Sequence, residues 1–233
     1  MMRPVWHKGG MRAAEVKMAD RHIIAIDGPA ASGKGTLAKK IAAHFNFAYL
    51  DTGSLYRAVA LGVLQVGAAP EDEAAALHAA TNLDMRRLGE ADISAALRRP
   101  ETGSAASIVA AMPAVRAQIL QAQRDFAAKP PDGQAGAVLD GRDIGTVVCP
   151  DARDKLFVTA RPEIRAERRW KELQAQPHAP DFETVLADIR IRDDRDMNRA
   201  TAPLQKAETA HLLDTSDLSI EQAFDAALAL LKA

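Results

Sequence analysis

The stretch His22–Thr36 reads HIIAIDGPAASGKGT, and it decides the fold. Its first six residues form an apolar run that ends in an aspartate, as a buried parallel strand does. The next seven fit the pattern G-x-x-x-x-G-K, and apolar residues at helical spacing follow them. A strand, a glycine loop and a helix in this order predict that backbone N–H groups surround a phosphate at the positive end of the helix dipole.

The predicted phosphate loop comprises nine residues, and we expect its lysine to contact the β- and γ-phosphates of a nucleotide. These residues are Gly28, Pro29, Ala30, Ala31, Ser32, Gly33, Lys34, Gly35 and Thr36. A serine or threonine that ligates Mg²⁺ usually follows the lysine, but Gly35 stands there, so we assign the metal contact to Thr36, directly or through water. The loop alone does not separate a kinase from a GTPase, a mechanical ATPase or a turn that binds nothing.

Strands and helices alternate along the chain, which predicts an α/β fold: a five-stranded parallel sheet flanked by helices. Further strands are expected at 47–50, 137–139, 155–158 and 211–213. Helices are expected at 35–45, 55–66, 71–80, 108–128, 162–173 and 182–198, and a last one after Ser219, which fits a capping box. Pro113 predicts a kink, or two helices that meet, within 108–128. We interpret 84–86 as a short strand and 98–103 as a loop.

Composition excludes several classes of protein. A net charge of −1 over 233 residues argues against a sequence-independent nucleic-acid binder. Cys149 is the only cysteine, which rules out an internal disulfide and fits a reducing compartment. No apolar run reaches the ~18 residues of a membrane span, and residues 1–20 lack the apolar core of a secretory signal. We therefore expect a cytoplasmic protein with no membrane or nucleic-acid partner, and a disordered or non-native tail at 1–20.

Polar residues follow four of the expected strands, at the edge where an α/β sheet binds its ligands. The sequences at these strand ends are DG at 27–28, DTG at 51–53, DG at 140–141 and Asp214. Arg57 and Arg142 follow two of these strands, and with Lys34 they predict a cluster of cations, although Arg57 alone could equally be a surface residue. Asp140 is either a carboxylate that holds Mg²⁺ through water or a turn or N-cap residue, and the sequence does not decide between these.

Arginine is concentrated between residues 161 and 199. The eight positions are Arg161, Arg165, Arg168, Arg169, Arg190, Arg192, Arg195 and Arg199. Helical ion pairs in solvent are the plain interpretation, and we expect it to hold for Arg161 and Arg190. Arg192, Asp196 and Arg199 instead share one helical face. Because a kinase that phosphorylates a phosphate needs cations and positioning rather than a strong base, this face predicts a second phosphate site.

Five stretches together resemble the bacterial cytidylate kinases, which are P-loop kinases of nucleoside monophosphates. They are the loop itself at 26–36, LDTGSLYR at 50–57, AAS at 105–107 with MPAVR at 112–116, DGRDIGTVV at 140–148 and RDDRDMNR at 192–199. The loop is common to many such kinases, whereas the last two stretches are far more specific. The resemblance extends from about Ile23 to the C-terminus.

This resemblance implies that the γ-phosphate of ATP is transferred to CMP or dCMP by a monomer with Mg²⁺ as cofactor. It implies three base-reading residues, Ser107, Arg116 and Asp143; three clamps on the CMP phosphate, Arg57, Arg142 and Arg199; and two sugar contacts, Arg192 and Asp196, with Tyr56 nearby. Thr52 stands where the family often has serine, and we expect its hydroxyl to keep the contact. Asp140 is counted with the CMP site.

The resemblance also implies that Lys34, Arg142, Arg168 and Arg199 act in catalysis, and that Arg165, Arg168 and Arg169 lie in a mobile lid. We expect one kinase domain at 21–233, with a core at 21–80, 105–160 and 205–233, a CMP-binding insert at about 81–104 and a helical lid at about 161–185. The insert is shortened between Met85 and Ile93, which leaves the preference among CMP, dCMP and UMP open.

Two alternative functions were weighed against CMP phosphorylation. A kinase for UMP or AMP is one, and Asp143 and Arg116 argue against it because a carboxylate accepts from the exocyclic amine of cytosine. A regulatory protein that hydrolyses GTP slowly is the other. It should carry an Asn-Lys-x-Asp motif for guanine, and the sequence has none.

Overall fold

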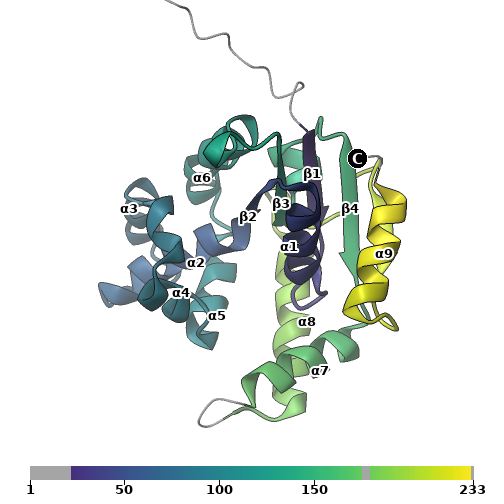
Figure 1. Cartoon of the computed structure of the whole chain (residues 1–233). Coiled ribbons are helices and arrows are strands. Elements are labelled where there is room, and N and C mark those ends of the chain that lie inside the picture. The colour runs from purple at the N-terminus through teal and green to yellow at the C-terminus, as the bar shows by residue number, and fades with distance from the viewer. Residues whose placement is uncertain (1–21, 175–178, 232–233) are drawn as a thin grey trace, which may run out of the picture.

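The computed structural model describes residues 22–174 and 179–231, so the predicted tail at 1–20 and part of the predicted lid lie outside it. Its centre is a parallel sheet with the strand order β2-β3-β1-β4-β5 (Figure 1). The strands are β1 His22–Asp27, β2 Ala48–Asp51, β3 Gly136–Gly141, β4 Asp154–Thr159 and β5 His211–Asp214. The predicted fold class is thereby confirmed, and each expected strand is found within two residues of its expected bounds.

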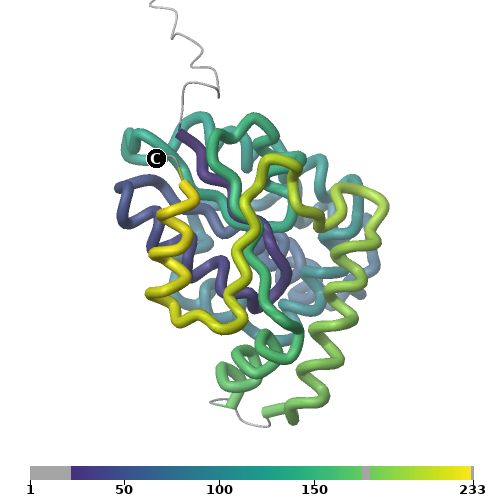
Figure 2. Tube along the Cα trace, turned by 90° about the vertical axis from the view of Figure 1, so that its right-hand side faces the viewer, coloured from purple at the N-terminus to yellow at the C-terminus, as the bar shows by residue number. Residues whose placement is uncertain are grey.

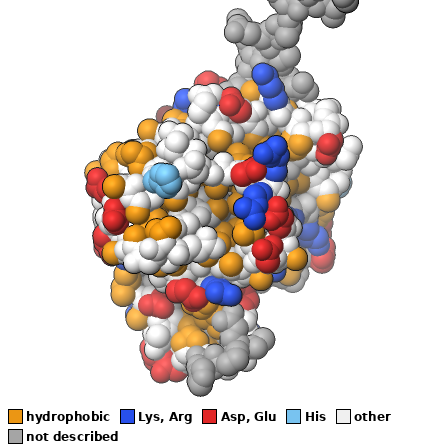
Figure 3. Space-filling model, turned by 90° about the vertical axis from the view of Figure 1, so that its left-hand side faces the viewer, with side chains coloured by type: hydrophobic (Ala, Val, Ile, Leu, Met, Phe, Trp, Pro, Cys, Tyr) orange, Lys and Arg blue, Asp and Glu red, His pale blue; other side chains and the backbone are white. Residues whose placement is uncertain are grey.

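Two helical layers cover the sheet because alternate strand residues point to opposite faces. Ile24 and Ile26 pack in a cluster with helices α1, Lys34–Phe45, and α9, Ile220–Leu230. Ile23 and Ala25 pack on the other face, in a cluster with four helices. These four are α2 Thr52–Gln65, α3 Glu73–Thr81, α5 Pro100–Val109 and α6 Pro113–Ala128. Figure 3 shows the outside of this layer, where apolar side chains are scattered among charged and other polar ones.

Two helices, α7 Pro162–Leu173 and α8 Phe182–Asn198, extend beyond the carboxyl ends of the strands (Figures 1 and 2). They have the bounds expected from the sequence and pack through a small apolar cluster of their own that includes Ala166, Leu173 and Ile189. The capping box at Ser219 is also confirmed, since its side chain accepts from Gln222 N–H and its backbone N–H donates to the Gln222 side chain.

Two local expectations were wrong. Residues 84–86 are not a strand: Asp84 accepts from Arg86 N–H and starts the short 3₁₀ helix η2, Met85–Gly89. Of residues 98–103, only 98 and 99 are the expected loop, because Pro100 is the first residue of α5, a position where a proline costs no hydrogen bond. Pro113 likewise starts α6, so the segment 108–128 is two helices rather than one with a kink.

The remaining elements complete the layer that holds the site. Residues 81–104 contain η2, helix α4 Ala91–Leu97 and the start of α5. The short η3, Pro131–Gly133, precedes β3, and a π-helical turn η4, Ile144–Val148, follows it. None of the described helices is long and apolar enough to cross a membrane alone. The consecutive segments Pro100–Val109 and Pro113–Gly133 together have the length and composition of a membrane span, but they are bent by 100° relative to each other.

Candidate active site

The glycine loop joins β1 to α1 in a conformation that its residue types allow. Gly28 has a φ of 155°, and a Cβ there would lie 2.0 Å from the carbonyl oxygen of Val158 on β4. Gly33 and Ala31 have φ values of 85° and 57°, so the backbone turns in the left-handed region at both. The loop thus forms the concave backbone that the sequence predicted for a phosphate.

Lys34 bends back over this loop, where its Nζ donates to the carbonyl oxygen of Pro29 at 3.2 Å. Burial, and then the nearby Arg142, lower the pKa of Lys34 from 10.5 to about 7. A phosphate bound in the loop would reverse that shift, because an anion stabilises the ammonium form. A bound anionic ligand would therefore stabilise the charged form of Lys34 at this buried position.

Asp140 occupies the space that Gly35 leaves open. A Cβ on Gly35 would lie 3.2 Å from Oδ2 of Asp140, and the hydroxyl of Tyr49 donates to the same oxygen at 3.1 Å. Burial, and then Asp51, raise the pKa of Asp140 to about 7. Asp140 lies inside β3, so its alternative as a turn or N-cap residue is excluded. Thr36 is exposed in the first turn of α1, and its metal contact stays a prediction.

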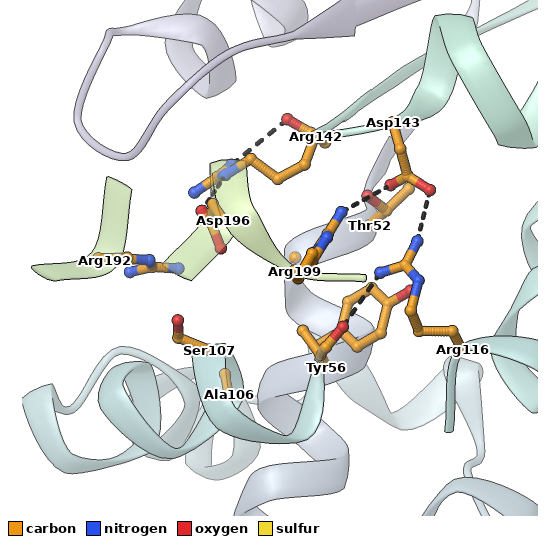
Figure 4. A pocket seen from close by; sticks show the side chains of 13 residues that line it. Thr52, Tyr56, Ala106, Ser107, Arg116, Arg142, Asp143, Arg192, Asp196 and Arg199 are labelled. Atoms are coloured by element: carbon orange, nitrogen blue, oxygen red, sulfur yellow. Dashed lines mark hydrogen bonds and ion pairs between the residues drawn. The ribbon is translucent and has the colours of Figure 1, made fainter. Parts of the chain in front are cut away.

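A pocket of about 430 Å³, partly open to solvent, lies at the same edge of the sheet (Figure 4). Its walls come from the start of α2, from α5 and α6, from the residues after β3 and from the end of α8. The lining residues are Thr52, Gly53, Tyr56, Ala106, Ser107, Ala110, Arg116, Gly141, Arg142, Asp143, Arg192, Asp196 and Arg199.

The structure thus brings nine of the eleven residues predicted for the CMP site into one pocket wall. The two others, Arg57 and Asp140, do not line it. Arg57 is half-buried on α2 beside Asp51, and burial lowers its pKa. The ring of Tyr56 lies 5.6 Å from the guanidinium carbon of Arg116, at the end of the pocket where the predicted base readers meet.

Charges in this pocket are only partly paired. Nη2 of Arg116 lies 2.5 Å from Oδ2 of Asp143, and Nε of Arg142 lies 2.8 Å from Oδ2 of Asp196. The lining holds four arginines against two aspartates, which leaves a surplus of two positive charges. This surplus is about equal in size and opposite in sign to the charge of one phosphate monoester near neutral pH.

Two of the arginine donors have no hydrogen-bond partner among the described residues. They are Nε of Arg192 and Nη2 of Arg199, both buried. The second lies 3.7 Å from Asp143, while Nε of Arg199 donates to the carbonyl oxygen of Ala202 at 2.7 Å. Burial, and then Arg142, lower the pKa of Arg192 to about 10. Buried donors without acceptors are costly, so this wall is suited to oxygen atoms brought by a ligand.

Two arginines of α7, Arg165 and Arg168, make hydrogen bonds to other elements of the protein. Arg165 is buried and makes a bidentate pair with Asp193 at 3.0 and 2.6 Å, and it also donates to the carbonyl oxygen of Ala30 in the loop at 3.3 Å. Arg168 donates to the carbonyl and hydroxyl oxygens of Thr215 at 2.6 and 3.1 Å and lies beside Gly33. Arg165 is therefore a fixed structural residue, whereas Arg168 lies next to the loop.

The remaining arginines of this region lie at the surface, as expected for two of them. Arg161 pairs with Asp217 and Arg190 with Glu163, and all four side chains are more than half exposed. Arg169, which was expected in the lid, lies 3.1 Å from Glu172 on the same helix. Arg161 and Arg190 are thus exposed and ion-paired as expected, but their partners lie on other elements, in the turn after β5 and on α7. Of these three arginines, Arg169 has its partner on its own helix.

Several residues at the site were missed by the sequence reasoning. Tyr49 holds Asp140, Thr215 donates to the carbonyl oxygen of Ser32 at 2.9 Å, and Arg195 donates to Oγ of Ser107 at 3.0 Å. The signals were weak: Thr215 directly follows a strand end, and Arg195 lies inside the polar run of α8. Within the described part of the chain, no group of three His, Cys, Asp or Glu side chains could hold a metal ion.

A glycine loop and an arginine pocket at one edge of a parallel sheet define a P-loop kinase of the nucleoside-monophosphate type. The model of the cytidylate kinase family matches residues 24–233. The chain belongs to that family. It is 58% identical over 210 residues to the cytidylate kinase of Azorhizobium caulinodans, which covers 90% of this chain and 98% of the relative.

Two further relatives agree with this assignment. The cytidylate kinase of Xanthobacter autotrophicus is 58% identical over 211 residues, which covers 91% of this chain and 97% of that one. The cytidylate kinase of Rhodospirillum rubrum is 56% identical over 209 residues, which covers 90% of this chain and 96% of that one. All three matches extend over nearly the whole length of both proteins.

Proposed function

We propose that the protein transfers the γ-phosphate of ATP to CMP or dCMP and gives ADP with CDP or dCDP. Membership of the cytidylate kinase family supports this reaction. The single structural observation that carries it is that two buried arginine donors, Arg192 Nε and Arg199 Nη2, have no hydrogen-bond partner among the described residues, in a pocket next to the phosphate loop. A nucleoside monophosphate in that pocket would give them acceptors, sugar oxygens for Arg192 and phosphate oxygens for Arg199.

Base recognition is assigned to the Arg116–Asp143 pair together with Ser107. The carboxylate of Asp143 accepts from the exocyclic amine of cytosine, and Arg116 donates to the ring carbonyl and ring nitrogen. Uracil offers a carbonyl oxygen in place of that amine, so Asp143 would then face an acceptor. In the structure these two side chains already bond to each other at 2.5 Å. A bound base would therefore replace part of an existing hydrogen-bonded arrangement and would not enter a site whose polar groups lack partners.

Phosphate positioning is assigned to Arg142 and Arg199, with Arg57 as a further clamp, and sugar contacts to Arg192 and Asp196 with Thr52 and Tyr56 nearby. The acceptor phosphate is already an anion at neutral pH, so no strong general base is needed. One of its oxygens attacks the γ-phosphorus, the bond to the β–γ bridging oxygen breaks, and ADP leaves with that electron pair. The negative charge of the phosphates during transfer is offset by four cations, Lys34, Arg142, Arg168 and Arg199.

Thr36 and, through water, Asp140 would hold the Mg²⁺ that accompanies ATP, and this ion supplies positive charge against the phosphates when it is bound. The donor set supports such a site. Asp140 offers a carboxylate at the loop, and Mg²⁺ in kinases is held by one or two protein oxygens and otherwise by phosphates and water. A larger protein cage, which the described residues lack, is not required.

The organisation of the chain is part of the proposal. We propose a single kinase domain at 21–233, with a shortened CMP-binding insert at about 81–104 and a lid at about 161–185. The compact helices of the insert and the hairpin of α7 and α8 support these divisions. We also propose that the enzyme acts as a monomer in the cytoplasm, and sedimentation at assay concentrations would test the first of these.

A coupled assay that records ADP formation with CMP, dCMP, UMP and AMP is the experiment that tests the function. We expect turnover with CMP or dCMP to exceed that with UMP and AMP. ATP hydrolysis that is independent of any monophosphate, or best turnover with AMP, would contradict the proposal.

A further inference from the structure

Arg195 is an arginine of α8 that the proposed reaction does not use. Its Nη1 donates to Oγ of Ser107 at 3.0 Å, from α8 to α5 across the end of the pocket. Ser107 is buried and lines the pocket, as Figure 4 shows, whereas Arg195 is half-buried and does not line it. Across the described residues, this is the one side-chain hydrogen bond between the two helices.

The chemistry of this contact fixes what Ser107 can do. A guanidinium has only donors, so Oγ of Ser107 must be the acceptor in the bond. The cation repels the hydroxyl proton, which therefore points away from Arg195. Since Ser107 lines the pocket and Arg195 does not, the side away from Arg195 is the ligand side.

The charge of Arg195 strengthens this effect. None of the carboxylates in the described part of the chain lies within ion-pair distance of its guanidinium, and a hydroxyl is its side-chain partner. The neighbouring arginines of the polar run differ, because Arg192 and Arg199 line the pocket themselves. A cation bonded to the oxygen of a hydroxyl polarises it and makes its proton a better donor.

We propose that Arg195 is a positioning residue that fixes the Ser107 hydroxyl as a hydrogen-bond donor toward the ligand, and so contributes to the choice of cytosine over uracil. The proposal rests on the function proposed above. The ring nitrogen N3, to which Ser107 and Arg116 would both donate, is an acceptor in cytosine and an N–H donor in uracil. A hydroxyl that is free to rotate serves either base, whereas one fixed as a donor favours cytosine.

Kinetics of Arg195→Gln with CMP and UMP test this proposal. A glutamine amide can accept from Ser107 as well as donate to it, so the hydroxyl regains its freedom. We expect kcat/KM for CMP relative to UMP to fall about threefold to tenfold, the effect of one hydrogen bond. KM for CMP should rise, while kcat with CMP and KM for ATP stay within about twofold. Arg195→Lys, which keeps a donor-only cation, should retain most of the ratio.

Arg190→Gln is the matched control, because Arg190 lies on the same helix but is exposed and bonds to Glu163. It should leave the ratio unchanged. An Arg195→Gln ratio equal to that of the wild type would overturn the proposal. So would an equal loss for CMP and UMP, since that is what a purely structural contact predicts.

A double-mutant cycle with Ser107→Ala separates the proposal from a direct role of Arg195. If Arg195 acts through Ser107, then Arg195→Gln has no further effect on the ratio once the hydroxyl is gone. The same fold-loss in the Ser107→Ala background would overturn the proposal. A wild-type protein that phosphorylates neither pyrimidine would instead contradict the proposed function, so the two failures are distinguishable.

Discussion

Arg116 and Asp143 form a buried ion pair in the pocket wall, with Nη2 and Oδ2 2.5 Å apart and both side chains less than a tenth exposed. Arg116 comes from α6 and Asp143 from the residues after β3, so the pair joins the helical layer to the sheet edge. Arg199 lies 3.7 Å from the second oxygen of the same carboxylate. One aspartate therefore faces two buried guanidinium groups.

Asp143→Asn should change both specificity and stability. The asparagine amide can donate to the uracil carbonyl as well as accept from the cytosine amine, so the preference for CMP over UMP should fall more than the affinity for ATP. Breaking one partner of a buried pair costs about 3 kcal/mol or more, and the free energy of unfolding should drop by that order. Steady-state kinetics and urea titrations measure the two effects. Unchanged selectivity for CMP would exclude Asp143 as a base reader.

Arg165→Ala should destabilise the protein far more than Arg161→Ala. Arg165 is buried against Asp193, and its loss leaves that carboxylate without a counter-charge, at a cost of about 3–5 kcal/mol. Arg161 pairs with Asp217 in solvent, where such a pair contributes about 0–1 kcal/mol. Urea unfolding of both variants makes the comparison. Similar losses for the two would show that Arg165 is not the structural residue described above.

The stability of the protein should fall as pH rises through the titration of Asp27. Burial raises the pKa of this carboxyl from 3.8 to about 6, although the N–H groups of Gly145 and Ile144 oppose the shift. The folded pKa is the higher one, so the stabilisation is complete below about pH 4 and lost above about pH 6. A difference of about two pH units corresponds to about 3 kcal/mol.

Asp27→Asn is the variant that isolates this pH effect, because it removes the titration. The difference in unfolding free energy between the wild type and Asp27→Asn should change between pH 4 and 6 and stay constant above pH 7. Urea titrations across this range measure it. Curves that run parallel from pH 4 to 7 would show that Asp27 does not titrate there.

Thr36→Val tests the assigned metal contact without disturbing the fold, since Thr36 is exposed. The variant keeps the shape of the side chain and removes the hydroxyl. We expect the gain in ATP affinity on addition of Mg²⁺ to shrink about tenfold, because one ligand to the ion is lost. Calorimetric titration with ATP, with and without Mg²⁺, measures this gain. An unchanged gain would assign the metal to other oxygens.

Local patterns in the sequence predicted most of the fold. The loop and the strand before it form a self-sufficient motif, and helices α7 and α8 end at the residues that apolar spacing and prolines indicated. Pro100 was misread because proline at the first turn of a helix looks, in sequence, like a proline that breaks one. Periodicity cannot separate these two uses.

The site was predictable as a set of residues but not as a set of contacts. Helical spacing predicted that Arg192, Asp196 and Arg199 share one face, and all three line the pocket. Arg199, however, is the extended C-cap of α8 and not part of the helix, so only Arg192 and Asp196 share a helical face. It could not show that Arg195 reaches Ser107 or that Arg165 is occupied by Asp193, since each bond joins residues far apart in the chain. Such partners depend on how the helices pack, which the sequence pattern does not encode.

Helix α8 contacts both proposed nucleotide sites within a single turn. Asp193 holds Arg165, which donates to the loop at Ala30, while Asp196 holds Arg142 in the acceptor pocket. A shift of this helix would therefore displace side chains at both sites at the same time. Linkage then requires reciprocity: if bound ATP tightens the binding of CMP through α8, bound CMP tightens the binding of ATP by the same factor. The cell's supply of one nucleotide would thus set how strongly the enzyme retains the other.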